Sequence, residues 1–264
     1  NRTTALSTAF AKSENITKPH TFVEGKMTVL HIQNIDNLAP CGSIGSSIED
    51  MSKWLIAQLD SGKYNEEVVL PFKILQRTRQ PQTIQGRVRH PFNEGHYNLY
   101  GLGWGLMDYE ETEIISHTGG VNGFVTSVTL LPEENLGVVV LTNTDQNAFF
   151  QSLKWEIIDS YLGLPYRNYD SSFYAGFEKR QEKNYNWLIE VRDSVAMNLK
   201  PELSLSEFEG KYKHDVYGFS ELKKVLSGNE AFKLDLAEKY SKDLMIASEK
   251  LRLWIWILRF EAYR

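Results

Sequence analysis

The stretch from Ile114 to Leu131, IISHTGGVNGFVTSVTLL, contains two alternating runs separated by a glycine-rich segment. Alternation of apolar and polar residues with period two is typical of a half-buried β-strand. The glycines between the runs predict a tight reversal at which the backbone comes close to another group. A bare hairpin needs one turn glycine, whereas three occur here within five residues. We therefore expect a hairpin whose main chain a ligand must approach.

The segments on either side of this hairpin predict more strands and two helices. The runs YGLGWGLMDY, TEIISHT, GFVTSVTLL and LGVVVLTN have strand length and short connections, which favour an antiparallel meander. Helical spacing predicts one helix over 48–59, begun by a capping box of Ser46 and Glu49, and another over 149–161. The predicted fold class is therefore α+β, an antiparallel sheet flanked by helices.

The pattern changes after residue 165. Residues 166–203 contain one more helical pattern with a charged face, which we interpret as a linker helix. From residue 204 to residue 264, short strand-like runs separated by turns predict a small all-β domain. The predicted organisation is a main domain over 1–165, the linker helix, and this β domain.

The composition is that of an ordinary globular protein. The chain has 264 residues, of which 42% are hydrophobic and 24% charged, and its net charge is −5. This acidic balance argues against nucleic acid as a partner. One cysteine, Cys41, excludes an internal disulfide and a cysteine-rich zinc site. No apolar run reaches the ~18 residues of a membrane span.

Three segments, in order, resemble the second half of the serine β-lactamase and penicillin-binding-protein family. They are PCGSIGSSIEDMSKWLIAQL, YGLGWG and SHTGGVNGFVTSVTLLPEENLGVVVLTN, and they look closest to the class C-like and esterase-like branch. The similarity covers residues 1–165. The terminal β domain resembles an appendage that many members carry. The resemblance implies a β-lactamase/transpeptidase-like fold.

The resemblance also implies a three-motif site, of which this chain carries the third motif. The family builds its site from Ser-x-x-Lys, from Tyr-x-Asn or Ser-x-Asn, and from Lys-Thr-Gly or His-Thr-Gly. The last is present as His117-Thr118-Gly119. The other two are expected upstream of PCGSIGSS, and the N-terminus reads like the interior of a longer chain. The nucleophile is therefore expected outside the 264 residues, and a further possibility is that the chain is one piece of a cleaved or incomplete protein.

The resemblance assigns roles to five residues of the hairpin. Acyl transfer passes through an oxyanion that preorganised N–H donors stabilise, and the backbone N–H of Gly120 is the expected donor. His117 is expected to orient the base or hydrogen-bond the substrate. The catalytic candidates are thus His117 and Gly120, and the substrate-binding candidates are Thr118, Gly119 and Asn122.

Other matches to site motifs are interpreted as coincidences. Ser220 and Lys223 have the Ser-x-x-Lys spacing, but they lie in the predicted β domain, where residues three apart on a strand face opposite ways. The triplets 166–168 and 13–15 match the second motif by letters alone. Three residues of HPFNEGH lack the spacing of a helical zinc site, namely His90, Glu94 and His96.

The function that the resemblance implies is hydrolysis of an ester or amide through an acyl-enzyme. An imidazole is mostly neutral at pH 7, so His117 in place of lysine weakens the case for a carboxylate-bearing β-lactam or D-amino-acid peptide. The alternative is a non-catalytic module that binds peptide or cell-wall fragments. No cofactor or metal is implied, the partner is a small-molecule or peptide substrate, and family habit favours export to the bacterial periplasm or cell surface. The oligomeric state has no signal in the sequence.

Overall fold

The computed structural model describes residues 3–23, 25–88, 90–93, 95–197, 210–214, 218–225, 231–236 and 261–262. The chain divides into two compact units, residues 1–180 and 181–264. None of the helices in the described ranges is long and apolar enough to cross a membrane.

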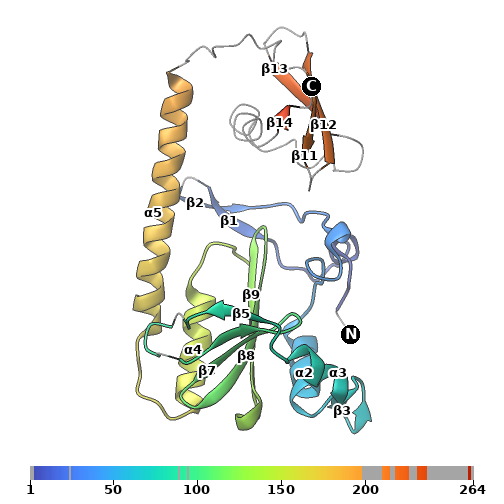
Figure 1. Ribbon diagram of the computed structural model, residues 1–264, viewed down its shortest axis with the longest axis vertical. Helices are drawn as coiled ribbons and strands as arrows, with labels where there is room; N and C mark the ends of the chain where they lie inside the picture. The colour runs from blue at the N-terminus through green and yellow to red at the C-terminus, as the bar shows by residue number, and fades with distance from the viewer. Residues whose placement is uncertain are drawn as a thin grey trace. The chain divides into compact units, whose positions relative to one another are not determined.

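The first unit is built on a six-stranded antiparallel sheet with the strand order β10-β9-β8-β7-β6-β5 (Figure 1). Chain neighbours are sheet neighbours throughout, because short connections can join only antiparallel strands. This confirms the predicted meander and the α+β class. The strands are β5 (Thr83–Gly86), β6 (Asn98–Tyr100), β7 (Gly105–Tyr109), β8 (Thr112–Val121), β9 (Phe124–Leu131) and β10 (Leu136–Thr142).

Two details of the predicted strands are wrong. The run over 100–109 is two strands, β6 and β7, joined by a tight connection in which Gly103 has a φ of 84°. Gly119 and Gly120 do not form the reversal but lie inside β8, which continues to Val121. The turn consists of Asn122 and Gly123, because Val121 pairs directly with Phe124.

Helices cover the two faces of this sheet. Along β8 and β9, adjacent residues point to opposite faces, so Ile114 packs in the cluster that contains Trp155 of α4, while Ile115 packs in the one that contains Leu55 of α2. The helices α2 (Ile48–Leu59) and α4 (Phe149–Tyr161) match the predicted ranges. The cap of α2 is shifted by one residue from the prediction, because Ser47 rather than Ser46 accepts the hydrogen bond, from the Asp50 N–H.

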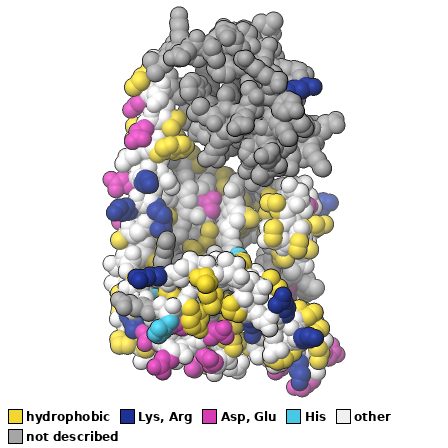
Figure 2. Space-filling model, viewed as in Figure 1, with side chains coloured by type: hydrophobic (Ala, Val, Ile, Leu, Met, Phe, Trp, Pro, Cys, Tyr) yellow, Lys and Arg dark blue, Asp and Glu magenta, His cyan; other side chains and the backbone are white. Residues whose placement is uncertain are grey.

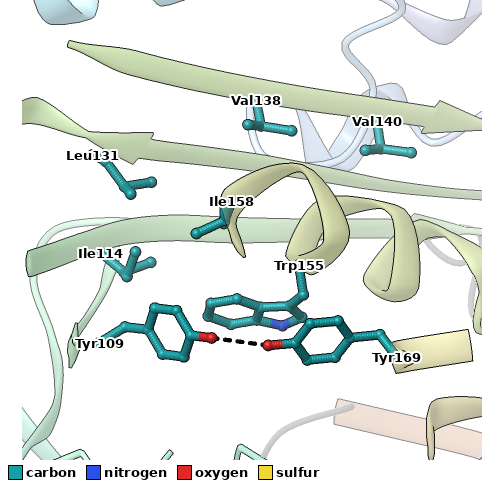
Figure 3. Packing of buried hydrophobic residues seen from close by; sticks show 8 residues of the cluster. All are labelled: Tyr109, Ile114, Leu131, Val138, Val140, Trp155, Ile158 and Tyr169. Carbon is teal, nitrogen blue, oxygen red and sulfur yellow. Dashed lines mark hydrogen bonds between the residues drawn. The ribbon is translucent and has the colours of Figure 1, made fainter. Parts of the chain in front are cut away.

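The larger core cluster lies between the sheet and α4 (Figure 3). Its aromatic members come from separate elements: Tyr109 ends β7, Trp155 belongs to α4, and Tyr169 begins α5 (Tyr169–Ala196). The aliphatic members extend the cluster along β8, β9, β10 and α4, and they are Ile114, Leu131, Val138, Val140 and Ile158.

A buried polar network attaches the beginning of α5 to this core. The hydroxyls of Tyr109 and Tyr169 both donate to the Asp159 carboxylate, and the two phenolic oxygens lie 2.9 Å apart. Arg167 donates to the Tyr109 hydroxyl at 2.9 Å and pairs with Glu110 at 3.2 Å. Burial is the main cause that raises the pKa of both tyrosines, that of Tyr169 to about 12.

Short elements complete the first unit. Hydrophobic side chains reach the surface in several patches on the face drawn in Figure 2. Exposed hydrophobic residues of the first unit include Phe22, Val23, Ile48 and Ile56. The short elements are α1 (Ser7–Phe10), β1 (His20–Val23), β2 (Lys26–Val29), η1 (Asp36–Leu38), β3 (Lys63–Tyr64), β4 (Glu67–Val68), α3 (Phe72–Thr78) and η2 (Pro132–Glu134).

The described part of the second unit, beyond α5, is a four-stranded antiparallel sheet with the order β13-β12-β11-β14. The predicted boundary between linker and β domain, at residues 203 and 204, lies outside the described residues, and the proposed division at 165, 203 and 264 stays a prediction. The strands are β11 (Gly210–His214), β12 (Gly218–Val225), β13 (Ala231–Leu236) and β14 (Glu261–Ala262).

Candidate functional site

The His-Thr-Gly motif lies on a part of β8 that has a neighbour on one side only. β7 begins at Gly105, which pairs with Ser116 of β8. From His117 to Val121, β9 is the one strand among the described residues that pairs with β8, and these five residues are all exposed. The sheet therefore has an open edge at the motif.

Hydrogen-bond alternation determines which main-chain groups face this edge. A two-residue turn joins β7 to β8, so the flanking pair Tyr109 and Thr112 is hydrogen-bonded, and every second residue of β8 after Thr112 bonds toward β7. The same alternation continues along β8 beyond Ser116, where β7 no longer lies beside it. Thr118 and Gly120 therefore direct their N–H and C=O groups to the open edge. Gly120 thus offers its N–H at the edge where a ligand can reach it.

The two glycines of the motif strand differ in their surroundings. A Cβ on Gly119 would lie 2.6 Å from the hydroxyl oxygen of Thr126, its partner on β9. A Cβ on Gly120 would meet nothing within 4 Å. Packing therefore requires glycine at position 119, whereas position 120 is open.

The tip of the β8–β9 hairpin is fixed by contacts with distant parts of the chain. The N–H of Gly123 donates to the Asp145 carboxylate at 2.8 Å, and the carbonyl of Gly123 accepts from the His20 N–H at 3.2 Å. Gly123 has a φ of 83°, and a Cβ there would lie 2.3 Å from that of Pro19. Asn122 is exposed beside it. These contacts fix the turn that follows the motif strand.

A cavity of about 230 Å³ adjoins the beginning of the open edge. His117 and Thr118 line it, and the hydroxyl oxygen of Tyr100 lies 2.9 Å from Nε2 of His117. Gly119, Gly120 and Asn122 are not among the lining residues. The remaining lining residues come from four strands and are Gln85, Asn98, Gly105, Leu106, Met107 and Ser116.

The sequence did not single out three of these lining residues: Gln85, Asn98 and Tyr100. Tyr100 belongs to the YGLGWG segment, which carried a resemblance without a role for its tyrosine. Trp104 of the same segment is buried and stacks on Trp54, with ring centroids 5.6 Å apart. It contributes to the core under the sheet and does not line the cavity.

The other motif matches have these positions. Ser220 and Lys223 lie on strand β12 and not on a helix. Asn168 precedes α5, where its side chain accepts from the Ser171 N–H at 3.2 Å. Glu94 lies outside the described residues.

The two histidines of HPFNEGH have different surroundings. His96 is exposed and contacts Asp108 at 2.6 Å. His90 packs against aromatic rings, the nearest being Trp155 with a centroid distance of 4.3 Å. Among the residues that the structure describes, no group of three or more His, Cys, Asp or Glu side chains is placed to hold a metal ion.

Residues 4–162 match the family model described as Beta-lactamase. The chain is 30% identical over 131 residues to the D-alanyl-D-alanine-carboxypeptidase/endopeptidase AmpH of Escherichia coli strain K12. This match covers 47% of this chain and 33% of that protein. The chain is also 28% identical over 145 residues to an unguisins hydrolase of Aspergillus violaceofuscus, which covers 47% of this chain and 23% of that protein. The chain thus spans a third or less of the length of these two relatives.

Among solved structures, the chain resembles the octameric penicillin-binding protein homologue from Pyrococcus abyssi. The TM-score is 0.53 at 16% sequence identity, and the match covers 90% of this chain and 45% of that one. At this identity the likeness concerns the fold alone. It agrees with the α+β fold inferred from the residues.

Proposed function

Since the chain belongs to the Beta-lactamase family, we propose that it is part of a serine hydrolase that cleaves an ester or amide through an acyl-enzyme. The observation that carries the proposal is the open edge of β8 at His117-Thr118-Gly119, beside a cavity. In this proposal a serine of a Ser-x-x-Lys segment, outside the 264 residues, attacks the carbonyl carbon. The leaving group departs, and water then hydrolyses the acyl-enzyme.

The edge supports a specific division of roles. The attack places negative charge on the carbonyl oxygen, and the Gly120 N–H on the open edge is the donor that we propose for it. Its absent side chain leaves the approach free, in keeping with the empty space at position 120. Thr118 offers its main-chain groups at the same edge, where an extended substrate can pair with them.

His117 has the position of a group that contacts the substrate or the base. Its ring is exposed and held by Tyr100 at the mouth of the cavity. At Gly119 a side chain would overlap the Thr126 hydroxyl oxygen, so glycine keeps β8 packed against β9 beside the substrate edge. Asn122, at the exposed hairpin tip, would contact only a substrate that extends along β8. Export to the periplasm or cell surface stays a prediction that fractionation of the source cells would test.

The test is covalent labelling of the full-length protein. A fluorophosphonate probe should add its mass to one serine in a helical Ser-x-x-Lys segment, and labelling should slow when a turned-over ester is present. The Ser220→Ala variant is the matched control and should label equally well. Absence of labelling in a folded full-length protein would refute the hydrolase and favour a module that only binds peptide or cell-wall fragments.

A further inference from the structure

We propose that the cavity beside His117 is a subsite for an uncharged amide group of the substrate, recognised by the side chains of Gln85 and Asn98. The inference rests on the proposed function and specifies its substrate class. It predicts a preference for peptide-like acyl groups over those that carry a carboxylate.

A β-bulge brings Gln85 to this cavity. Along β5 and β6, Ile84 pairs with Leu99, whereas the next pair is Gly86 with Asn98, so Gln85 is the extra residue. Bulges bend a strand and redirect a side chain, and they are frequent beside active sites. Gly86, with a φ of 103°, completes this irregular segment. Two adjacent strands thus contribute one carboxamide each to the lining.

The two carboxamides are available to a ligand. Among the described residues, neither side chain makes a hydrogen bond or another polar interaction. Asn98 is half-buried and Gln85 is exposed, and both line the cavity. A carboxamide provides two N–H donors and a carbonyl acceptor, so a pair of them complements both the N–H and the C=O of a substrate amide.

The charge of the lining argues for a neutral occupant. None of the nine lining residues is Asp, Glu, Lys or Arg. A carboxylate placed there would lose hydration without gaining a permanent positive partner, which is costly. Met107, which is only partly buried, adds apolar surface for the carbon atoms of the group. A volume of about 230 Å³ admits one amide with its flanking carbons and is smaller than a pocket for a whole ligand.

The proposal is tested with three matched p-nitrophenyl esters and the full-length protein. The acyl groups are N-acetylglycyl, pentanoyl and glutaryl, which have equal chain length and carry an amide, no polar group and a carboxylate, respectively. For each enzyme variant, the measured quantity is the ratio of kcat/KM for the amide ester to that for the pentanoyl ester. Asn98→Leu and Gln85→Leu should each lower this ratio about tenfold, the scale of a lost polar contact. The glutaryl ester should be the poorest substrate of the wild type.

The control variant is Ile84→Gln, which changes an exposed neighbour on β5 that does not line the cavity. It should keep the wild-type ratio. A ratio unchanged in both leucine variants, or equal losses for all three esters, would overturn the subsite while leaving the hydrolase intact.

If the wild type cleaves none of the esters, ligand binding decides the subsite, and covalent labelling decides the proposed function separately. N-acetylglycine methylamide should then shift the side-chain NH₂ resonances of Gln85 and Asn98 in ¹H–¹⁵N spectra. The Gln85 shift should be lost in Asn98→Leu, and the Asn98 shift should be lost in Gln85→Leu. Unshifted resonances would overturn the subsite as well.

Discussion

The hydroxyl oxygen of Tyr100 lies 2.9 Å from Nε2 of His117, although β7 lies between the strands that carry them. Tyr100 pairs with Gly105 at the first position of β7, and Gly105 in turn pairs with Ser116. Because the intervening residue has no side chain and β7 begins there, the phenol can reach the imidazole. The contact fixes one ring nitrogen and leaves Nδ1 to face other partners.

Replacing Tyr100 by phenylalanine should free the His117 ring without removing it. One neutral hydrogen bond contributes about 1 kcal/mol, so we expect kcat/KM of the full-length enzyme to fall about fivefold. The ¹⁵N shifts of the imidazole should also move, because the tautomer is no longer held. Tyr97→Phe, beside the same strand, is the control and should alter neither. Unchanged imidazole shifts in Tyr100→Phe would show that the contact does not position His117.

The Gly119–Thr126 contact predicts an energetic coupling. Gly119→Ala should destabilise the fold by about 1–3 kcal/mol, because its Cβ would overlap the Thr126 hydroxyl and that β-branched side chain is stiff. Thr126→Ala removes the overlapping atom and should restore most of the loss in the double variant. Gly120→Ala, where the space is open, should cost little stability. Chemical denaturation of the four proteins measures the coupling, and strictly additive effects would refute it.

The sequence predicted those elements whose signals are local. Alternation defined β8, β9 and β10, and the helical period defined the ranges of α2 and α4. Where two similar residues were adjacent, local signals chose wrongly, as with Ser46 for Ser47 at the start of α2. The turn was expected over the segment from Gly119 to Gly123, of which only Asn122 and Gly123 form it, because composition alone cannot tell a glycine that packs against Thr126 from one that turns the chain.

The site needed information that spacing does not contain. The motif identified His117 and Thr118, which do line the cavity. Tyr100 and Asn98 join them only through the register of β6, β7 and β8, and that register depends on where each strand begins. The contribution of Gln85 depends on a bulge, a single extra residue that no alternation pattern signals.

His90 should make the stability of the protein fall in mild acid. Burial first, and then the charges of Lys154 and Arg167, lower its pKa to about 4. An unfolded histidine binds a proton near pH 6.5, so from pH 6.5 down to 4 the unfolded state binds more protons and the native state loses stability. At pH 5 the loss is on the order of 1 kcal/mol after allowance for partial exposure.

Thermal unfolding from pH 7 to pH 4.5 measures this dependence. The His90→Phe variant keeps an aromatic ring against Trp155 and should show a flatter profile than the wild type. His31→Phe is the control, because His31 is exposed, and it should retain the steep profile. Parallel profiles for the wild type and His90→Phe would show that His90 does not cause the loss of stability in mild acid.

Lys154 should lower stability at neutral pH. Its side chain is buried, and desolvation lowers its pKa to about 8, although its ammonium lies 4.3 Å from the centre of the Trp155 ring. Between pH 8 and 10.5 the unfolded state binds more protons than the native state, so wild-type stability rises with pH there.

The Lys154→Met variant should therefore be about 1 kcal/mol more stable than the wild type at pH 7, net of the lost cation–π contact, and the difference should be smaller at pH 9.5. Urea unfolding at pH 7 and pH 9.5 measures this difference, and Lys73→Met, at an exposed position, is the control. If Lys154→Met were less stable than the wild type at pH 7, the buried lysine would not be destabilising.

His117 offers the sharpest test of the site. It is exposed at the open edge, so a packing role is small and His117→Ala should leave the melting temperature nearly unchanged. If it contacts the substrate or the base, its loss should lower kcat/KM of the full-length enzyme about 30-fold to 1,000-fold, corresponding to about 2–4 kcal/mol of transition-state stabilisation. The His117→Lys variant should improve the carboxylate-bearing glutaryl ester relative to the pentanoyl ester, because it adds a permanent positive charge to the cavity wall. Identical kcat/KM values and ester preferences in the wild type and both variants would make His117 a bystander and leave the open edge without a side chain that acts on the substrate.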